Sequence, residues 1–179
     1  MILVGKLRVS SDPFVSHGYQ PSLKNEEHRL MRVQEGRPGR LFLLTFQHGE
    51  DLIQEICQFA VRENIRAAWI QFLGALKQGR LVTGPEKPQL PPKPVWREFS
   101  QAWEVVGIGN LFWEDNAPKV HVHVALGKGN VTMMGCLRLE NEIYLVAEAL
   151  LVELTGLNLC RRLDPDLGVS MLNSVDLKA

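Results

Sequence analysis

Apolar residues recur at steps of three and four positions in one early segment of the chain. The residues with this spacing are Leu52, Ile53, Ile56, Cys57, Phe59 and Ala60. Such spacing places them on one face of an α-helix. Glu50 and Asp51 suit the positive start of that helix, and Asn64 is typical of its end. The pattern therefore predicts one amphipathic helix, with Cys57 as a structural residue on its apolar face.

Most of the remaining pattern is typical of β-strands, which are short apolar or alternating stretches bounded by Gly, Pro, Asn and Asp. Strands are predicted at residues 27–33, 41–46, 67–76, 78–82, 95–99, 103–112, 120–126, 131–139, 157–163 and 169–172. The third and fourth of these are expected to form a hairpin.

Three further segments complete the pattern. Residues 36–39 predict a turn before the first core strand, and the proline-rich residues 84–94 predict a loop. Residues 143–154 fit a helix or a strand equally well. One helix followed by many antiparallel strands is an α+β layout, expected over residues 26–175 after an extension at residues 1–25.

Two histidines two positions apart lie in the predicted strand 120–126. Alternate side chains of a strand share a face, so both rings should point the same way. A hairpin that turns at residues 127–130 places His121 opposite Cys136. The same register places His123 opposite Met134. Because opposed residues have Cβ atoms roughly 4.5–5.5 Å apart, two imidazoles and a thiol can converge on one ion.

Imidazole and thiolate are typical ligands of zinc or another divalent transition metal. Three protein ligands leave one coordination position open, as catalytic metal sites do. Two structural interpretations stay open beside this one. The histidines also fit a polar or hydrogen-bonded pair on a strand, and Cys136 also fits a small buried hydrophobe. A slip of one residue in the hairpin would move Cys136 to the other face.

Composition and charge exclude some classes of protein. The chain has 179 residues, of which 45% are apolar and 22% charged, as in ordinary globular domains. Twenty basic residues balance twenty acidic ones, so the basic excess that is common in nucleic-acid-binding domains is absent. Three widely spaced cysteines do not fit a disulfide framework.

Neither a signal peptide nor a membrane span is expected. The amino-terminal apolar run is only four residues long. The longest apolar run, residues 143–154, is too short to cross a bilayer and is interrupted by Glu148 and Glu153. A cytoplasmic protein is therefore expected.

Several segments resemble, in order, the plant-and-prokaryote-conserved (PPC) domain family. That family has a His-x-His strand, a glycine-containing hairpin and a Gly-Gly-His-Leu stretch. The similar segments here are residues 120–127, Gly129, residues 134–137, Gly49-Glu50-Asp51-Leu52, Leu73-Gly74-Ala75-Leu76, Trp103-Glu104-Val105 and Asp164 to Gly168. The resemblance covers about residues 28–173.

The resemblance implies a large antiparallel β-sheet with one main α-helix packed on it, usually assembled as a homotrimer. It also implies a metal at the histidines, since some prokaryotic members carry one. Plant members join the domain to an AT-hook and bind AT-rich DNA, so a DNA-associated or regulatory role is implied as well.

The chain departs from the family pattern in two places. Met134-Gly135-Cys136 stands where the family has Gly-Gly-His, so the metal site either persists with altered selectivity or is lost. Residues 35–38 echo the AT-hook core Arg-Gly-Arg-Pro, but glutamate replaces the first arginine. Because an AT-hook lays its arginines into the minor groove, this segment is interpreted as a turn.

Glu148 and Glu104 are the carboxylates considered beside the candidate metal site. Either can orient a ligand histidine by a hydrogen bond or act as a general base. Glu148 also fits a structural ion pair, and Glu104 also fits a solvated side chain.

Three functions remain open from the sequence. The first is a trimeric, metal-binding protein associated with DNA, for which Arg29, Arg32, Arg37 and Arg40 are the candidate basic face. The second is a metal-dependent enzyme acting on a small molecule, with water as the nucleophile. The third is an assembly module without chemistry.

Overall fold

The computed structural model describes residues 32–138 and 140–175. The described residues from 34 onward belong to one compact unit. The predicted extension at residues 1–25 and nearly all of the predicted strand 27–33 lie outside the described residues. No helix within the described part is long and apolar enough to cross a membrane.

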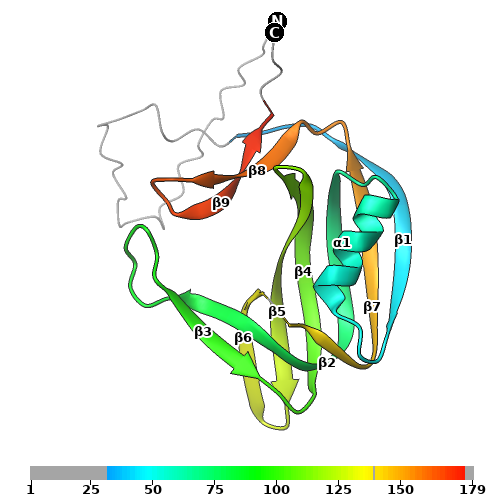
Figure 1. Ribbon diagram of the computed structural model, residues 1–179, viewed down its shortest axis with the longest axis vertical. Coiled ribbons are helices and arrows are strands. Elements are labelled where there is room, and N and C mark those ends of the chain that lie inside the picture. Colours follow the sequence, from blue (N-terminus) through cyan, green and yellow to red (C-terminus); the bar gives the residue numbers. More distant parts are fainter. Residues whose placement is uncertain (1–31, 139, 176–179) are drawn as a thin grey trace, which may run out of the picture. The chain divides into compact units, whose positions relative to one another are not determined.

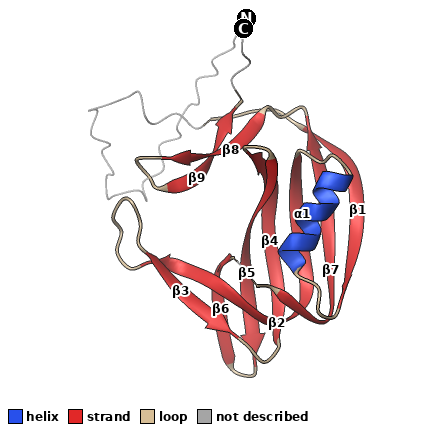
Figure 2. Ribbon diagram, viewed as in Figure 1, coloured by secondary structure: helices blue, strands red, loops and turns tan. Residues whose placement is uncertain are grey.

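One helix and nine strands make up the described part of the chain (Figures 1 and 2). In order they are β1 Arg37–Gln47, α1 Leu52–Arg62, β2 Ala67–Pro85, β3 Pro94–Phe99, β4 Trp103–Glu114, β5 Ala117–Lys128, β6 Val131–Leu137, β7 Glu142–Thr155, β8 Leu159–Asp164 and β9 Val169–Ser174. The large, mainly antiparallel sheet with one helix that the sequence predicts is therefore confirmed.

Asp51 fixes the start of α1 with both of its carboxylate oxygens. Oδ1 accepts a hydrogen bond from the backbone N–H of Gln54 at 2.9 Å, and Oδ2 accepts one from that of Asn141 at 2.9 Å. The first bond is an N-cap, and the second ties the helix to the chain just before β7. The predicted helical face is buried, with Leu52 and Ile56 fully enclosed. Figure 1 shows α1 against the curled sheet, where it contacts β5 and β7.

The predicted hairpin within residues 67–82 is wrong, because β2 continues as a single strand to Pro85. Its first half pairs with β4 and β7, and its second half pairs with β3 and β6. Register shifts near Leu76 mark the change of partners. At these glycine and polar residues β2 changes the strands with which it pairs, whereas the predicted hairpin required the chain to reverse direction there.

The secondary structure of two other segments is determined by their pairing with β2 and β7. Residues 143–154, which fitted either element, form strand β7 between β1 and β2. The predicted turn at residues 36–39 is wrong, because β1 starts at Arg37. Gly39 lies against β7, where an added Cβ would be 2.9 Å from the Thr155 Cγ2 atom. The glycine thus permits close strand approach there.

The sheet closes on itself around part of the core. β2 pairs with β4, β4 with β5, β5 with β6, and β6 again with β2. Core side chains alternate along these strands, as the burial of Val122, Val124 and Leu126 on β5 shows. The intervening residues of β5, among them both histidines, therefore belong to the opposite face.

That opposite face, called the open face below, carries rows of directly paired residues across six strands. The first row is Leu43, Leu150, Gln71, Ile108, His123 and Cys136. The second row is Thr45, Glu148, Leu73, Val106, Ala125 and Met134. Large apolar side chains here remain exposed in the single chain, including Leu43, Leu73 and Met134.

Candidate metal centre

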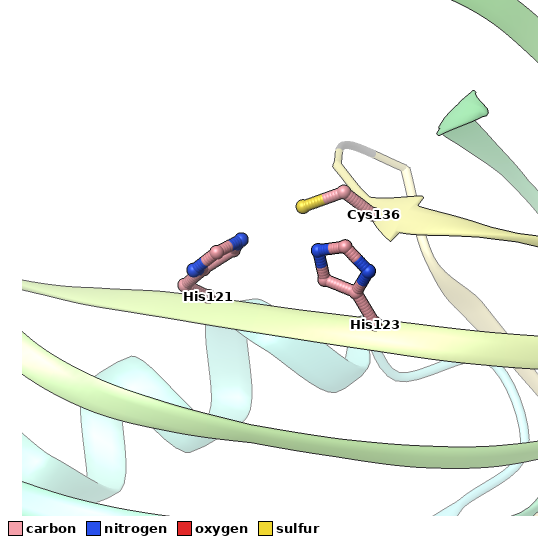
Figure 3. A group of neighbouring side chains, drawn as sticks. All are labelled: His121, His123 and Cys136. Atoms are coloured by element: carbon pink, nitrogen blue, oxygen red, sulfur yellow. The ribbon is translucent and has the colours of Figure 1, made fainter. Parts of the chain in front are cut away.

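His121, His123 and Cys136 converge at one end of the open face. Both histidines lie on β5 and the cysteine lies on β6. One ligand atom from each side chain lies within 4.8 Å of the other two. Figure 3 shows the thiol of Cys136 and the two imidazole rings turned toward one another. The structure therefore brings together the three residues that the sequence singled out.

The register that joins them differs by two positions from the predicted one. Lys128 pairs with Val131, so the loop residues of the hairpin are Gly129 and Asn130, and Gly129 has a left-handed φ of 59°. Glycine adopts this conformation without steric cost, which explains the position of the turn.

His123, not His121, is consequently the residue opposite Cys136. Met134 pairs with Ala125, not with His123 as predicted. Because side chains alternate with a period of two, a shift of two positions leaves every residue on its predicted face. The three side chains still meet for this reason, although their predicted pairing was wrong.

Two glycines let the neighbouring strands approach β5 and β6 closely. A Cβ added at Gly109 on β4 would lie 2.1 Å from the carbonyl oxygen of His121. A Cβ added at Gly135 on β6 would lie 2.6 Å from the carbonyl oxygen of Val82. Any larger residue would push the strands that carry the site apart.

The two ligand types differ in their protonation. Burial, together with smaller effects of the neighbouring Arg161, His123 and Arg138, lowers the pKa of His121 to about 4. His121 is therefore neutral at pH 7, which is the form that binds metal. Burial raises the pKa of the Cys136 thiol, against the opposing effect of Arg138 and Arg161. An ion must therefore displace a proton from this thiol.

The donor set fits a divalent transition metal. Bonds of about 2.0–2.3 Å in a tetrahedral zinc site place neighbouring donor atoms roughly 3.3–3.6 Å apart. The limit of 4.8 Å among these three side chains is close to that geometry and requires a small inward movement. Among the described residues, no fourth His, Cys, Asp or Glu belongs to the group. One position of a tetrahedral ion would be open.

The model of the Plants and Prokaryotes Conserved (PCC) domain, the family abbreviated PPC above, matches residues 33–155. This chain belongs to that family. The match covers both histidines, the cysteine, α1 and strands β1 to β7.

Solved structures agree with the assignment to the PPC family. A plant- and prokaryote-conserved protein from Pyrococcus horikoshii is 29% identical, with a TM-score of 0.71 over 82% of this chain and 100% of that one. A metal-containing protein from Archaeoglobus fulgidus is 28% identical, with a TM-score of 0.71 over 80% of this chain and 100% of that one.

A more distant structure shares the fold. A protein from Ralstonia eutropha, provisionally named as DNA-binding, is 20% identical, with a TM-score of 0.63 over 73% of this chain and 89% of that one. A comparison with curated proteins found no significant match.

In this PPC domain, the structure does not place Glu148 or Glu104 at the candidate metal centre. Both side chains are exposed, and no ion pair of Glu148 is found within the described residues. Three strand spacings, roughly 14 Å, separate Glu148 on β7 from His123 on β5. Glu104 pairs with Gly127, four residues along β5 from His123, which is roughly 13 Å. A hydrogen bond from either carboxylate to His123 is not made within one chain.

Sequence reasoning missed Arg161 on β8, which the structure places beside the centre. Its side chain is only 5% exposed. Nη2 donates to Oδ1 of Asn110 at 2.7 Å, and Asn110 pairs with His121 across β4 and β5. Nη1 donates to the backbone oxygen of Ser170 at 3.1 Å. The sequence did contain one indication of this position. Arg161 alternates with Leu159 and Leu163 in the predicted strand, so it shares a strand face with two apolar residues.

The candidate basic face for DNA is weakened by the ion pairs of Arg40. Its Nε lies 2.8 Å from a carboxylate oxygen of Glu153, and its Nη1 lies 3.2 Å from one of Glu63. Arg29 lies outside the described residues. At least one of the four arginines is thus neutralised by neighbouring carboxylates.

Proposed function

We propose that this PPC-domain protein is a homotrimer in which His121, His123 and Cys136 bind zinc or another divalent transition metal. One coordination position is left for a small-molecule ligand. The observation that carries the proposal is the convergence of two imidazoles and a thiol within 4.8 Å on neighbouring strands. The Archaeoglobus relative, which is named as metal-containing, supports it.

The chemistry of the centre follows from the donor set. A bound divalent metal would act as a Lewis acid toward a ligand in its open position. As ligands, the imidazoles of His121 and His123 would add no charge to the centre, and Cys136 would contribute one negative charge after losing its proton. One negative charge against two positive ones leaves the centre cationic, which favours anionic or polarisable ligands.

The open face supports assembly from several copies. Leu43, Leu73, Val106 and Met134 are all more than half exposed on it. A contiguous apolar area of this kind is typical of an interface. A hollow of about 600 Å³ on the same face is lined by these four residues and by His123. Contact between copies at this face would enclose the metal centre. The open face is therefore a suitable interface for the trimer that the family resemblance implies.

Elemental analysis of protein purified without a histidine tag tests the metal. We expect near-stoichiometric zinc or another transition metal in the parent, with loss of most of it in Cys136→Ser and His123→Ala. Cys160→Ser is the matched control, since it removes a half-buried free cysteine outside the group and should leave the metal content unchanged. Metal-free parent protein, even after reconstitution with zinc, would overturn the proposal.

Light scattering coupled to size-exclusion chromatography tests the assembly. The parent should have three times the chain mass of 20.2 kDa. Val106→Asp buries a charge in the proposed interface and should yield monomers. Leu163→Asp, an exposed apolar residue on β8 outside the open face, should stay trimeric. A monomeric parent would contradict the assembly.

We place a small-molecule function ahead of a DNA-associated one. The chain has no net charge, and Arg40 is engaged by two carboxylates. The DNA-associated or regulatory role keeps its support from the family resemblance. Retention of AT-rich duplex DNA that falls steeply between about 50 and 200 mM salt would establish it. We retain residues 26–175 as the domain and the cytoplasm as its location on sequence grounds.

A further inference from the structure

A second hollow lies beside the candidate metal centre and shares His121 with it. Its volume is about 770 Å³. The rest of its wall comes from β4, β5, β8, β9, the turn residues next to β4 and β9, and the residue that follows β6. Four cationic side chains and two carboxylates line it, in a protein whose charges balance over the whole chain. The cations are Lys119, Arg138, Arg161 and Arg162, and the carboxylates are Glu114 and Asp115.

Arg161 is the buried cation of this hollow. Its two hydrogen bonds go to neutral oxygens of Asn110 and Ser170, and none goes to a carboxylate within the described residues. Its Nε atom is buried and has no hydrogen-bond partner there. A buried guanidinium with an unpaired donor is unfavourable unless an acceptor completes it.

Glu114 does not fill that role directly. Its carboxylate already accepts hydrogen bonds from Lys119 and from the Ser170 hydroxyl. It therefore acts on Arg161 only through space. The charge of Arg161 also reaches both His121 and Cys136, which places this cation at the border between the hollow and the metal centre.

Arg138 adds a second cation at the same border. It follows β6 two residues after Cys136, and continuing the β5–β6 register by one pair on the same face places it opposite His121. Its side chain is exposed, and no carboxylate partner for it is found within the described residues. Two guanidinium groups thus flank a neutral imidazole that would carry the ion.

We infer that this hollow binds the oxyanion group of a small molecule, a carboxylate or a phosphate, between Arg138, Arg161 and the metal centre. Guanidinium groups bind both kinds of oxyanion by paired, charge-assisted hydrogen bonds. The inference rests on the proposed function for the open metal position, but the two arginines belong to the chain and offer their charge without metal as well.

Calorimetric titration of the full-length protein with inorganic phosphate and, separately, with succinate tests the inference. Each probe is titrated into zinc-loaded and chelator-treated protein, and the metal content of every sample is measured. At least one probe should bind, and Arg138→Gln should weaken it about tenfold, the usual loss for one charge-assisted contact. Arg138→Lys keeps the charge and should lose less. Arg97→Gln, the same change on exposed β3, should leave binding unchanged.

The outcomes separate this inference from the proposed function. Zinc binding without any anion binding, or equal affinities in Arg138→Gln and Arg97→Gln, would overturn the anion site alone. Absence of zinc binding would overturn the metal proposal, while anion binding that is weakened by Arg138→Gln would still support the hollow as an anion site. A variant at Arg161 is a poorer choice, because the residue also joins β8 to β4 and its loss threatens the fold.

Discussion

His123 and Cys136 are directly opposed residues on the antiparallel strands β5 and β6. The imidazole and the thiol therefore meet through sheet pairing, a few residues from a hairpin loop of only two residues. Sheet pairing fixes the separation of the two Cα atoms, so their approach depends little on loop conformation. A centre held in this way is prearranged for an ion.

The raised pKa of the Cys136 thiol predicts that zinc affinity increases with pH. Because burial keeps the thiol protonated at pH 7, binding must release its proton, and affinity should rise about tenfold per pH unit below the thiol pKa. Competition with a chromophoric chelator at pH 6, 7 and 8 measures this. Cys136→His supplies a ligand that is already neutral above its usual pKa of about 6.5, so its affinity should change little from pH 7 to 8. Equal affinity of the parent at all three values would contradict the prediction.

The lowered pKa of His121 predicts a loss of stability in mild acid for the metal-free protein. Its pKa is about 4 when folded and 6.5 when unfolded. The stabilisation is therefore complete above pH 6.5 and is lost as pH falls toward 4, where only the unfolded chain takes up the proton. After allowance for partial exposure, about 1–2 kcal/mol should be lost.

Urea unfolding at pH 7 and pH 4.5, with a chelator present, checks this effect. His121→Gln cannot titrate and should lose about that much less stability between the two pH values. Because all carboxylates are common to both proteins, the difference between them isolates His121. An identical loss in both proteins would show that His121 does not contribute.

Substitution of Gly109 should separate β4 from β5, the strand that carries both histidines, and should lower the free energy of unfolding. Gly109→Ala places a methyl group where 2.1 Å separates it from the backbone oxygen of His121, so β4 and β5 must move apart. Overpacking of this kind costs about 1–3 kcal/mol. Gly127→Ala is the control, because nothing lies within 4 Å of its added Cβ. The measurement is the free energy of unfolding in urea, and a Gly109→Ala protein as stable as Gly127→Ala would refute the close contact.

Removal of the Asp51 carboxylate should destabilise the protein through two lost hydrogen bonds. Asp51→Ala removes the N-cap of α1 and leaves the N–H of Asn141 without its acceptor. A loss of about 1–3 kcal/mol is expected. Glu55→Ala removes a half-buried carboxylate from the same first helical turn, for which no hydrogen bond is found within the described residues, and should cost far less. Thermal and urea unfolding of both variants compare the two changes.

The sequence predicted the helix and the hairpin because both depend on local periodicity. Alternation placed His121 and His123 on one face, and the predicted hairpin register added Cys136 to that face. The exact pairing depended on which residues form the turn. Because Gly129 adopts a left-handed conformation, the observed pairing of β5 with β6 differs by two positions from the predicted one. This error in register did not change the predicted site, because a shift by an even number of residues keeps each side chain on the same face of the sheet.

Features that depend on distant parts of the chain could not be predicted in this way. The continuity of β2 past Leu76 comes from its change of partners, and those partners are strands that follow it at widely different distances in sequence. Glu148 looked buried because its neighbours are apolar, but alternate residues of β7 face solvent in the single chain. Arg161 gained its place beside His121 only through the pairing of β8 with the end of β4.

The position of β7 between β1 and β2 affects the chain while it is being synthesised. β1 and β2 leave the ribosome early, yet among the described strands the only sheet neighbour of β1 is β7, which begins at Glu142. Until that residue and those after it emerge, β1 has no partner and one edge of β2 is uncovered. Nascent chains therefore expose two strand edges that are open to pairing with other molecules. The sheet that carries the candidate metal centre can be completed only after the residues of β7 have been translated.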